Sequence, residues 1–236
     1  MQALVVNLEE PQSLPEVYLG QLAEWDAHFR RELYLTNVMK DRAFRRLVED
    51  IDSFCAKNMV LGFHYTRGFP ADFLAHGLLV RSGEQSRSES MQRFREIFTP
   101  AQCAAISAAW AQHFTAGQPE VRDSRVWFNF TTSALGNGGA DRLLTYYGGE
   151  QIYLPIRELP GIGKTLRSIG QPLIVKCALV PAELQTFIEH PWGSIVTSSY
   201  HRLVNPAAHP TEHSDQDGWQ SVSVPPERIE VISYEH

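Results

Sequence analysis

Residues 59-79 read "MVLGFHYTRGFPADFLAHGLL", and this stretch joins an apolar strand to a strongly polar end. The apolar first half has the composition of a buried strand. The strand then continues into His64, Tyr65, Thr66 and Arg67. Polar groups at such a position cost free energy when buried unless they are paired. These side chains therefore either bond within the core or contact a ligand.

The second half of the same stretch predicts a short helix followed by another extended segment. "PADFLAH" at 70-76 has helical composition, and Gly77 is placed to end the helix because glycine readily adopts positive φ. "LLV" at 78-80 then predicts extended chain. The predicted order is strand, turn, short helix, strand.

Two amphipathic helices are predicted before this strand. Ser13 and Glu16 have the spacing of a capping box, and Pro15 fits the first turn of the first helix. The second helix begins at about Asp41. Apolar residues recur at helical spacing in both, at Leu19, Leu22, Trp25, Phe29 and Leu33 and at Phe44, Leu47, Val48, Ile51 and Phe54. We therefore assign residues 1-58 to an N-terminal helical extension.

The chain changes from helical to extended patterning near residue 125. Before it, the polar stretch 82-92 predicts a surface loop that runs into a helix near 92-98, and Thr99 with Pro100 begins a further helix. After it, strand composition is found in "RVWFNFTT", "QIYLPI", "PLIVKCALV", "GSIVTSS", "WQSVSV" and "RIEVISY". Helices followed by strands favour an α+β domain over residues 59-236 with a mixed or antiparallel sheet. We expect the N-terminal helical extension to pack on this domain, so that the chain forms one compact unit.

Composition indicates an ordinary globular protein. Of its 236 residues 43% are hydrophobic and 20% are charged, and no apolar run approaches the length of a membrane span. The start "MQALVVNLEEPQ" is unlike a signal peptide, so we expect a cytoplasmic protein. Cys55, Cys103 and Cys177 are widely spaced and odd in number, which favours small buried residues in a reducing compartment.

The charge pattern argues against a broad nucleic-acid surface but leaves room for a local one. The formal net charge is -6. Basic residues concentrate only within residues 30-46, where acids are interleaved with them. We interpret this concentration as a solvated helix face.

Two motifs with familiar spacing do not support a site. "GIGKT" at 161-165 would need glycine five residues before Gly163 to form a phosphate loop, and that position is Glu158. His209, His213, Asp215 and Asp217 lie in "NPAAHPTEHSDQDG". The Pro-, Asp- and Gly-rich composition of that segment favours a polar loop over a metal site, so no metal is predicted.

Residues 59-80 resemble the first NAD-binding segment of the ADP-ribosyltransferase superfamily, in which a strand-borne His or Arg precedes a short helix and a Gly-Leu turn. Bacterial toxins of the superfamily, including toxins that modify DNA, are similar here. The resemblance implies an ADP-ribosyltransferase-like core with NAD as the substrate. It also implies that His64 contacts a ribose hydroxyl beside the backbone of Tyr65 and Thr66, and that Arg67 binds a phosphate bidentately.

Two later segments extend the resemblance. "FNFTTSA" at 128-134 resembles the Ser-Thr-Ser strand of the arginine-led class, with Thr131, Thr132 and Ser133 in its place. "LLTYYGGEQIYLPI" at 143-156 supplies Tyr146 and Tyr147. A tyrosine ring can stack on a flat heteroaromatic ring, so these residues are assigned to dinucleotide binding with Thr131 and Ser133.

Glu150, at the start of the apolar run of that segment, is the candidate catalytic carboxylate beside His64. Breaking the bond between nicotinamide and ribose builds positive charge on the sugar, which a nearby carboxylate stabilises. The alternative is that Glu150 stabilises a helix N-terminus after Gly149. Several of these toxins carry the catalytic Glu on the penultimate strand, shortly before a segment similar to "VPPERIEVISY". The matching position in this chain falls near "DGWQSVSV", where Gln220 stands instead of Glu.

Three functions follow from these residues. The first is a mono-ADP-ribosyltransferase that uses NAD, as a toxin or defence effector, and modifies a protein or nucleic-acid acceptor without acting at a membrane. The second is a non-catalytic binding module of the same fold. The third is an NAD glycohydrolase, in which water takes the sugar.

Overall fold

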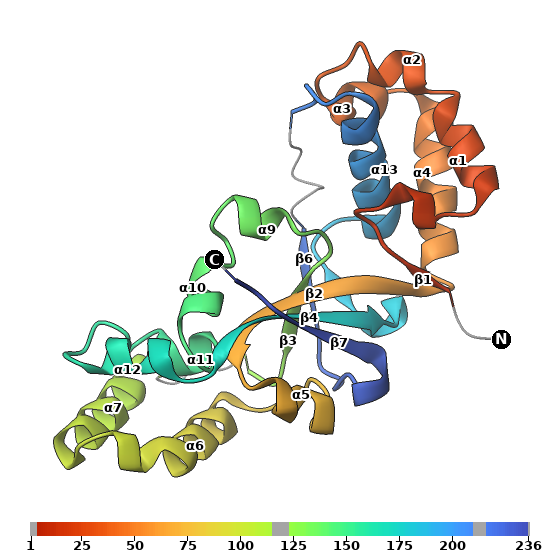
Figure 1. The fold of residues 1–236 in the computed structure, drawn as a ribbon. Helices are drawn as coiled ribbons and strands as arrows, with labels where there is room; N and C mark the ends of the chain where they lie inside the picture. Colours follow the sequence, from red (N-terminus) through yellow and green to blue (C-terminus); the bar gives the residue numbers. More distant parts are fainter. Residues whose placement is uncertain (1–3, 115–122, 210–215, 236) are drawn as a thin grey trace. The chain divides into compact units, whose positions relative to one another are not determined.

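The computed structural model of the chain describes residues 4-114, 123-209 and 216-235. The chain divides into two compact units (Figure 1). Unit 1 consists of Met1–Phe63, Trp127–Asn137 and Cys177–Gln220, and unit 2 consists of His64–Val126, Gly138–Lys176 and Ser221–His236.

The described residues form a seven-stranded sheet whose hydrogen-bonded order is β5-β6-β3-β2-β4-β7, with β1 paired to β2. The strands are β1 (Val5–Val6), β2 (Met59–Gly68), β3 (Val126–Asn129), β4 (Gln171–Leu179), β5 (Gln185–Thr186), β6 (Asp217–Gln220) and β7 (Ile229–Ser233). β1 runs parallel to β2, whereas β3 is antiparallel to β2 with Phe63 opposite Asn129. This mixed sheet with its helices confirms the predicted α+β class.

Unit 1 is built around two long helices. Its helices are α1 (Glu16–Ala23), α2 (Asp26–Phe29), α3 (Leu35–Val38), α4 (Arg42–Cys55), α9 (Ser133–Gly136) and α13 (Pro191–Val204), with the 3-10 turns η1 (Pro11–Ser13) and η3 (Pro181–Glu183). α4 and α13 lie side by side (Figure 1). Asp52 on α4 accepts the backbone N–H groups of Trp192 and Gly193 at 2.9 and 3.1 Å. The Asp52 carboxylate thereby satisfies two donors in the first turn of α13.

The first predicted helix differs from the observed structure. α1 ends at Ala23, the short α2 follows, and Leu33 is exposed. The capping box is absent from the described structure of this helix, because Ser13 belongs to η1 and its hydroxyl bonds to the backbone of Asn7. The second predicted helix is confirmed as α4, whose N-cap Asp41 accepts the Ala43 N–H at 2.7 Å.

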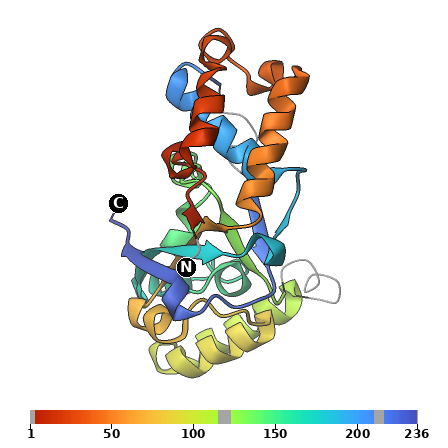
Figure 2. The same ribbon diagram turned by 90° about the vertical axis from the view of Figure 1, so that its right-hand side faces the viewer.

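Unit 2 places its helices around a separate apolar cluster. They are α5 (Pro70–His76), α6 (Gly83–Phe94), α7 (Pro100–His113), α10 (Asp141–Thr145), α11 (Glu150–Tyr153) and α12 (Ile162–Ser168), with the turns η2 (Arg95–Ile97) and η5 (Pro226–Arg228). α6 packs against α11, and Figures 1 and 2 draw α6 and α7 in yellow to yellow-green at the bottom of each view. Buried Trp110 on α7 donates its indole N–H to the Ile152 carbonyl at 2.9 Å, which ties α7 to α11.

The predicted strand, short helix and Gly-Leu turn are present in this part of the chain. β2 ends at Gly68, α5 covers Pro70–His76, and Gly77 has φ of 73° at the C-cap. Leu78 then exchanges backbone hydrogen bonds with Val224 at 2.8 and 2.9 Å. A side chain on Gly77 would collide with the Val224 carbonyl, so the close approach itself requires glycine there.

Three predicted segments have the wrong secondary structure. The expected loop 82-92 lies almost wholly in α6, which begins with a capping box between Ser82 and Gln85. "QIYLPI" is helix and turn, and "GSIVTSS" lies inside α13. α13 is buried on most of its faces, so its β-branched residues reflect core packing in a helix that Pro191 begins. None of the helices among the described residues is long and apolar enough to span a bilayer.

Candidate functional site

The polar end of β2 is held in unit 2 by Arg67. Its Nε donates to the Ile169 carbonyl at 2.9 Å and its Nη2 to Gly170 at 3.0 Å, while Nη1 is 3.4 Å from the Leu144 carbonyl. Burial lowers the pKa of the Arg67 guanidinium. A guanidinium has five N–H donors, so these bonds to described residues leave donors that could serve a phosphate. The main observed role of Arg67 is therefore to tie the end of β2 to the backbone at Leu144, Ile169 and Gly170.

The three residues before Arg67 differ in exposure. Tyr65 and Thr66 are buried, whereas His64 is half-buried. Their backbone is extended as part of β2. Of the three, His64 thus presents the most accessible side chain at this end of the strand.

The Tyr-Tyr-Gly-Gly-Glu segment lies beside the same strand end. The Gly148 N–H donates to the Arg67 carbonyl at 3.4 Å. Gly148 and Gly149 have φ of 86° and 71°, and the chain then enters α11 at Glu150. Positive φ at two successive residues favours glycine at both, which explains the Gly pair of the sequence. The structure therefore brings the segment that carries Glu150 to the end of β2.

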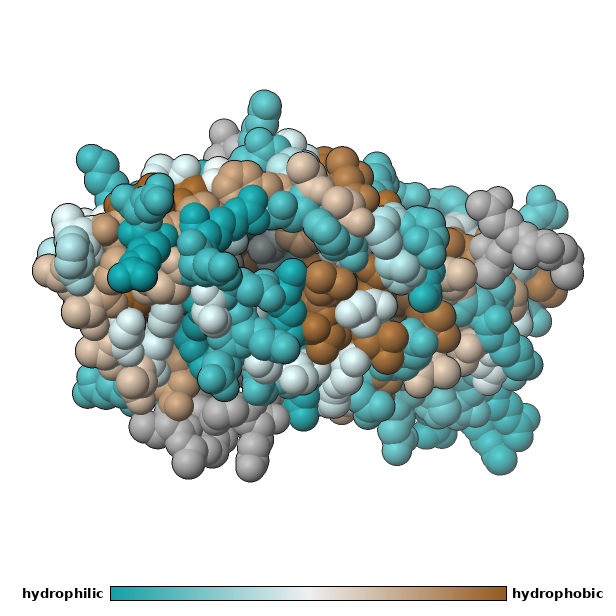
Figure 3. Space-filling view, turned by 90° about the horizontal axis from the view of Figure 1, so that it is seen from below, coloured by the Kyte–Doolittle hydropathy of each residue, from teal (hydrophilic) through white to brown (hydrophobic). Residues whose placement is uncertain are grey.

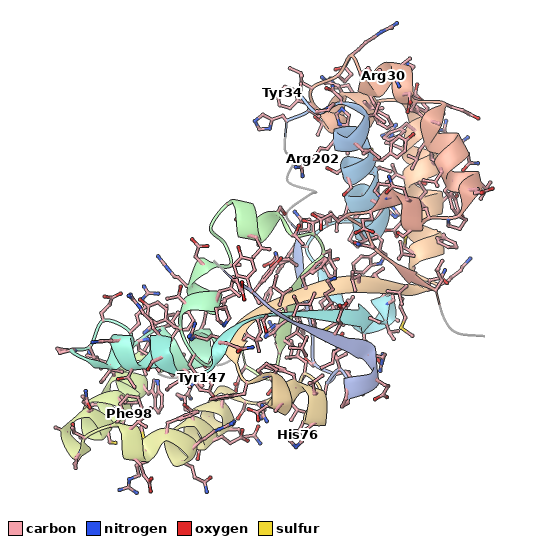
Figure 4. The ribbon with its side chains drawn as sticks, in the orientation of Figure 1. Arg30, Tyr34, His76, Phe98, Tyr147 and Arg202 are labelled. Carbon is pink, nitrogen blue, oxygen red and sulfur yellow. The ribbon has the colours of Figure 1, made fainter. Side chains whose placement is uncertain are left out.

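Tyr146 and Tyr147 pack into unit 2. Tyr146 is buried, and its hydroxyl accepts a hydrogen bond from Nη2 of Arg167 at 2.6 Å. Tyr147, labelled in Figure 4, packs against Phe94 and Phe69 with ring centroids 4.9 and 6.2 Å away. Burial raises the pKa of the Tyr147 hydroxyl. Both rings thus already contact protein groups, and their stacking on a ligand stays a prediction.

Glu150 is half-buried and is the first residue of the four-residue helix α11, whose N-cap is Gly149. A carboxylate in a first helical turn is favoured by the partial positive charge of the unpaired N–H groups there. This position agrees with the helix-stabilising alternative. Glu150 nevertheless belongs to the same segment as Gly148, whose N–H contacts β2 at the Arg67 carbonyl.

Thr131 and Ser133 belong to unit 1, where they follow β3. Their hydroxyls lie 2.6 Å apart within hydrogen-bonding distance. Between them, the hydroxyl and N–H of Thr132 both donate to the carboxylate of Glu9, at 2.5 and 3.2 Å. Glu9 was not predicted from the sequence as part of this segment, because 123 residues separate it from Thr132 and no local pattern joins them.

A second feature that the sequence did not predict is a hollow of about 580 Å³ along α6 and α7. Arg87, Ser88, Met91, Arg95, Ser107 and Trp110 contribute to its lining. Figure 3 shows hydrophilic residues gathered over α6 on this face. Arg87 donates to the Gln151 side chain at 2.9 Å, and its guanidinium lies 4.3 Å from the Phe114 ring centre. The sequence did not predict this hollow, because the polar composition of residues 82-92 favoured a surface loop where the structure has α6.

The described residues include no group of three or more His, Cys, Asp or Glu side chains that could hold a metal ion. His213 and Asp215 lie outside the residues that the structure describes. "GIGKT" begins the seven-residue helix α12. Gly163 in this helix approaches the Arg157 carbonyl, which gives the glycine a packing role.

No family model, curated protein or solved structure matches the chain at a significant level.

Proposed function

We propose that the protein is a mono-ADP-ribosyltransferase-like enzyme that uses NAD. The observation that carries this proposal is the backbone bond between the Arg67 carbonyl and the Gly148 N–H. It brings together residues 59-80, which resemble the first NAD-binding segment of the superfamily, and residues 143-156, which supply the candidate dinucleotide-binding tyrosines and Glu150. One ends β2 with half-buried His64, and the other carries Tyr146, Tyr147 and Glu150.

In the proposed reaction, the bond between the ribose C1′ and the nicotinamide nitrogen breaks, and its electron pair leaves with nicotinamide. His64 holds a ribose hydroxyl, and the Glu150 carboxylate stabilises the positive charge that develops on the sugar. A nucleophile of the acceptor then bonds to C1′ and loses its proton. The acceptor is a protein or a nucleic acid, and we propose that the enzyme acts in the cytoplasm as a toxin or defence effector.

Two observations favour a second candidate, a non-catalytic module that binds NAD. Gln220 on β6 is buried, with 2% of its surface exposed, at the position where several of the toxins carry the catalytic Glu. Glu150 also occupies the first turn of a helix, where a carboxylate has a structural role. A glycohydrolase, with water as the acceptor, is the third possibility within the same chemistry.

Nicotinamide release from NAD tests the proposal. Glu150→Gln preserves size and most hydrogen bonds but removes the charge, so turnover should fall about a hundredfold while NAD affinity changes little. His64→Ala should lower both affinity and turnover. Glu96→Gln, at an exposed position in η2, is the matched control and should behave as the wild type.

The outcomes separate the candidates. NAD binding without turnover in the wild type supports the non-catalytic module. Turnover that persists in Glu150→Gln removes the catalytic role of this residue. Radiolabel from NAD that stays on a macromolecule identifies a transferase, whereas release of free ADP-ribose alone identifies a glycohydrolase.

A further inference from the structure

Three arginines gather on one exposed face of α4. Arg42, Arg45 and Arg46 are all exposed, and the opposite face of the helix is buried through Phe44 and Leu47. Because residues three and four apart share a helix face, the three guanidinium groups are neighbours. Together with Glu49 they line a shallow hollow of about 240 Å³. We call these three residues the α4 arginine cluster.

No ion pair to a described residue neutralises the cluster, although the carboxylate of Glu49 lines the same hollow. The three side chains of the cluster form no hydrogen bond or ion pair with any residue that the structure describes. Arg30, labelled in Figure 4, differs because it pairs with Asp26 at 3.1 Å. Glu49 lines the hollow but makes no ion pair within the described part of the chain.

The position of the cluster on the helix is also unfavourable for stability. α4 begins Arg-Ala-Phe-Arg-Arg, so all three cations lie within its first five residues. The partial positive charge at a helix N-terminus favours acids in the first turn and disfavours cations. Like charges three and four residues apart also repel one another. A bound anion would relieve both effects at once.

From this arrangement we propose that the α4 arginine cluster binds the phosphate backbone of a nucleic acid. Three of the four residues that line the hollow are arginines, and the planar guanidinium of Arg matches two phosphate oxygens. Arg42 and Arg46 are one turn apart, and this row of cations along the helix suits a ligand with repeated phosphates. The inference is independent of the proposed NAD chemistry, because none of the three arginines is assigned to NAD binding or turnover.

The affinity should depend on salt in a defined way. A protein that neutralises three phosphates of a single strand releases the counterions bound to them, which gives a slope of about -2 in log affinity against log salt. Affinity should therefore fall about 20-fold between about 50 and 200 mM salt. The net charge of -6 confines this binding to a local contact.

Fluorescence anisotropy with a short, labelled, single-stranded oligonucleotide of mixed sequence tests the proposal on the full chain. Replacing Arg42, Arg45 and Arg46 together by Gln should weaken binding at least about tenfold at low salt and abolish most of the salt slope. The control variant replaces exposed Lys57, Arg142 and Lys164 by Gln and should bind as the wild type, although its net charge changes equally.

Stability provides a second readout. The triple variant of the cluster should melt at the same temperature as the wild type or higher, because repulsion and the unfavourable helix-end charge are removed. A single Arg45→Gln variant should show an intermediate loss of binding with an unchanged melt. Lower stability of the triple variant would contradict the argument from uncompensated charge.

Several binding results would overturn the proposal. One is the absence of oligonucleotide binding by the wild type at low salt, and another is equal weakening in the cluster and control variants. Poly-glutamate or anionic phospholipid vesicles that displace the oligonucleotide at equal charge concentration would also overturn it, because the cluster would then lack selectivity for a nucleic-acid backbone.

Discussion

Arg67→Met tests the anchoring role of Arg67 most sharply. The substitution keeps an unbranched apolar stem but removes the donors that bind the carbonyls of Ile169, Gly170 and Leu144. The bonds to Ile169 and Gly170, at 2.9 and 3.0 Å, have normal length, whereas the 3.4 Å contact to Leu144 is weak. The cost should therefore come mainly from two charged hydrogen bonds.

Hydrogen bonds to charged groups contribute about 1.5-3 kcal/mol each, and Arg67 is only half-buried, so the lower end of this range applies. Two such bonds give about 3 kcal/mol, and we expect Arg67→Met to lower the free energy of unfolding by about 2-4 kcal/mol. Arg67→Lys should cost less, about 1-2 kcal/mol, because an ammonium keeps the charge but lacks the planar fork.

Urea unfolding followed by circular dichroism measures this change, provided that the m value is unchanged. Hydrogen exchange should also accelerate in residues 144-148 and 169-170, which Arg67 holds. Arg95→Met is the control, because Arg95 is exposed, and it should stay within about 0.5 kcal/mol of the wild type. Equal stability of Arg67→Met and Arg95→Met would refute the anchoring role.

Three further predictions address other parts of the chain. Burial and the hydrogen bond to Asp26 raise the pKa of Tyr200 to about 12. The contribution of the Tyr200 hydroxyl to stability is therefore present below pH of about 10 and is lost as pH rises toward 12. Tyr200→Phe should flatten this part of the alkaline unfolding curve, and an unchanged curve would contradict the prediction. Gly170 has φ of 63°, and a Cβ added to it would collide with the Gly68 carbonyl. Gly170→Ala should therefore lower the free energy of unfolding in urea by at least about 1 kcal/mol. A neutral effect would show that β2 can shift. A thiol reagent should label Cys103 in the folded protein much faster than the two buried cysteines, as peptide mapping would show; equal labelling would contradict their burial.

The strand, helix and turn of residues 59-79 could be predicted because their signals are local. The apolar run, the helical composition of 70-76 and the positive φ of Gly77 follow from neighbouring residues. α4 was predicted for the same reason, since Phe44, Leu47 and Val48 recur on one face.

Other features depend on contacts distant in sequence. The carbonyls that Arg67 binds lie 77 to 103 residues away, so its anchoring role has no local signature. The segment "GSIVTSS" was wrongly predicted as a strand, because burial on most faces of α13 removes the helical alternation of polar and apolar residues. "QIYLPI" was wrongly predicted for a related reason, since Ile152, Tyr153 and Ile156 are all buried.

The site prediction divides in the same way. The sequence supplied the polar strand end and the Tyr-Tyr-Gly-Gly-Glu segment separately, and the bond between Arg67 and Gly148 is visible only in the fold. The position of Glu150 at the start of α11 agrees with the alternative that the sequence left open. The charge pattern of residues 30-46 predicts a solvated helix face, whereas the absence of ion pairs between the α4 arginine cluster and described residues is visible only in the fold.

Thermal unfolding with and without NAD tests the central proposal most directly. NAD at about 100 times its dissociation constant should stabilise the protein by about 2.7 kcal/mol. For a chain of this length, that gain raises the melting temperature by about 5-11 °C. We expect this increase for the wild type and a much smaller one for His64→Ala. A wild-type melting temperature that does not change at any NAD concentration up to several millimolar would contradict the proposal that the protein uses NAD.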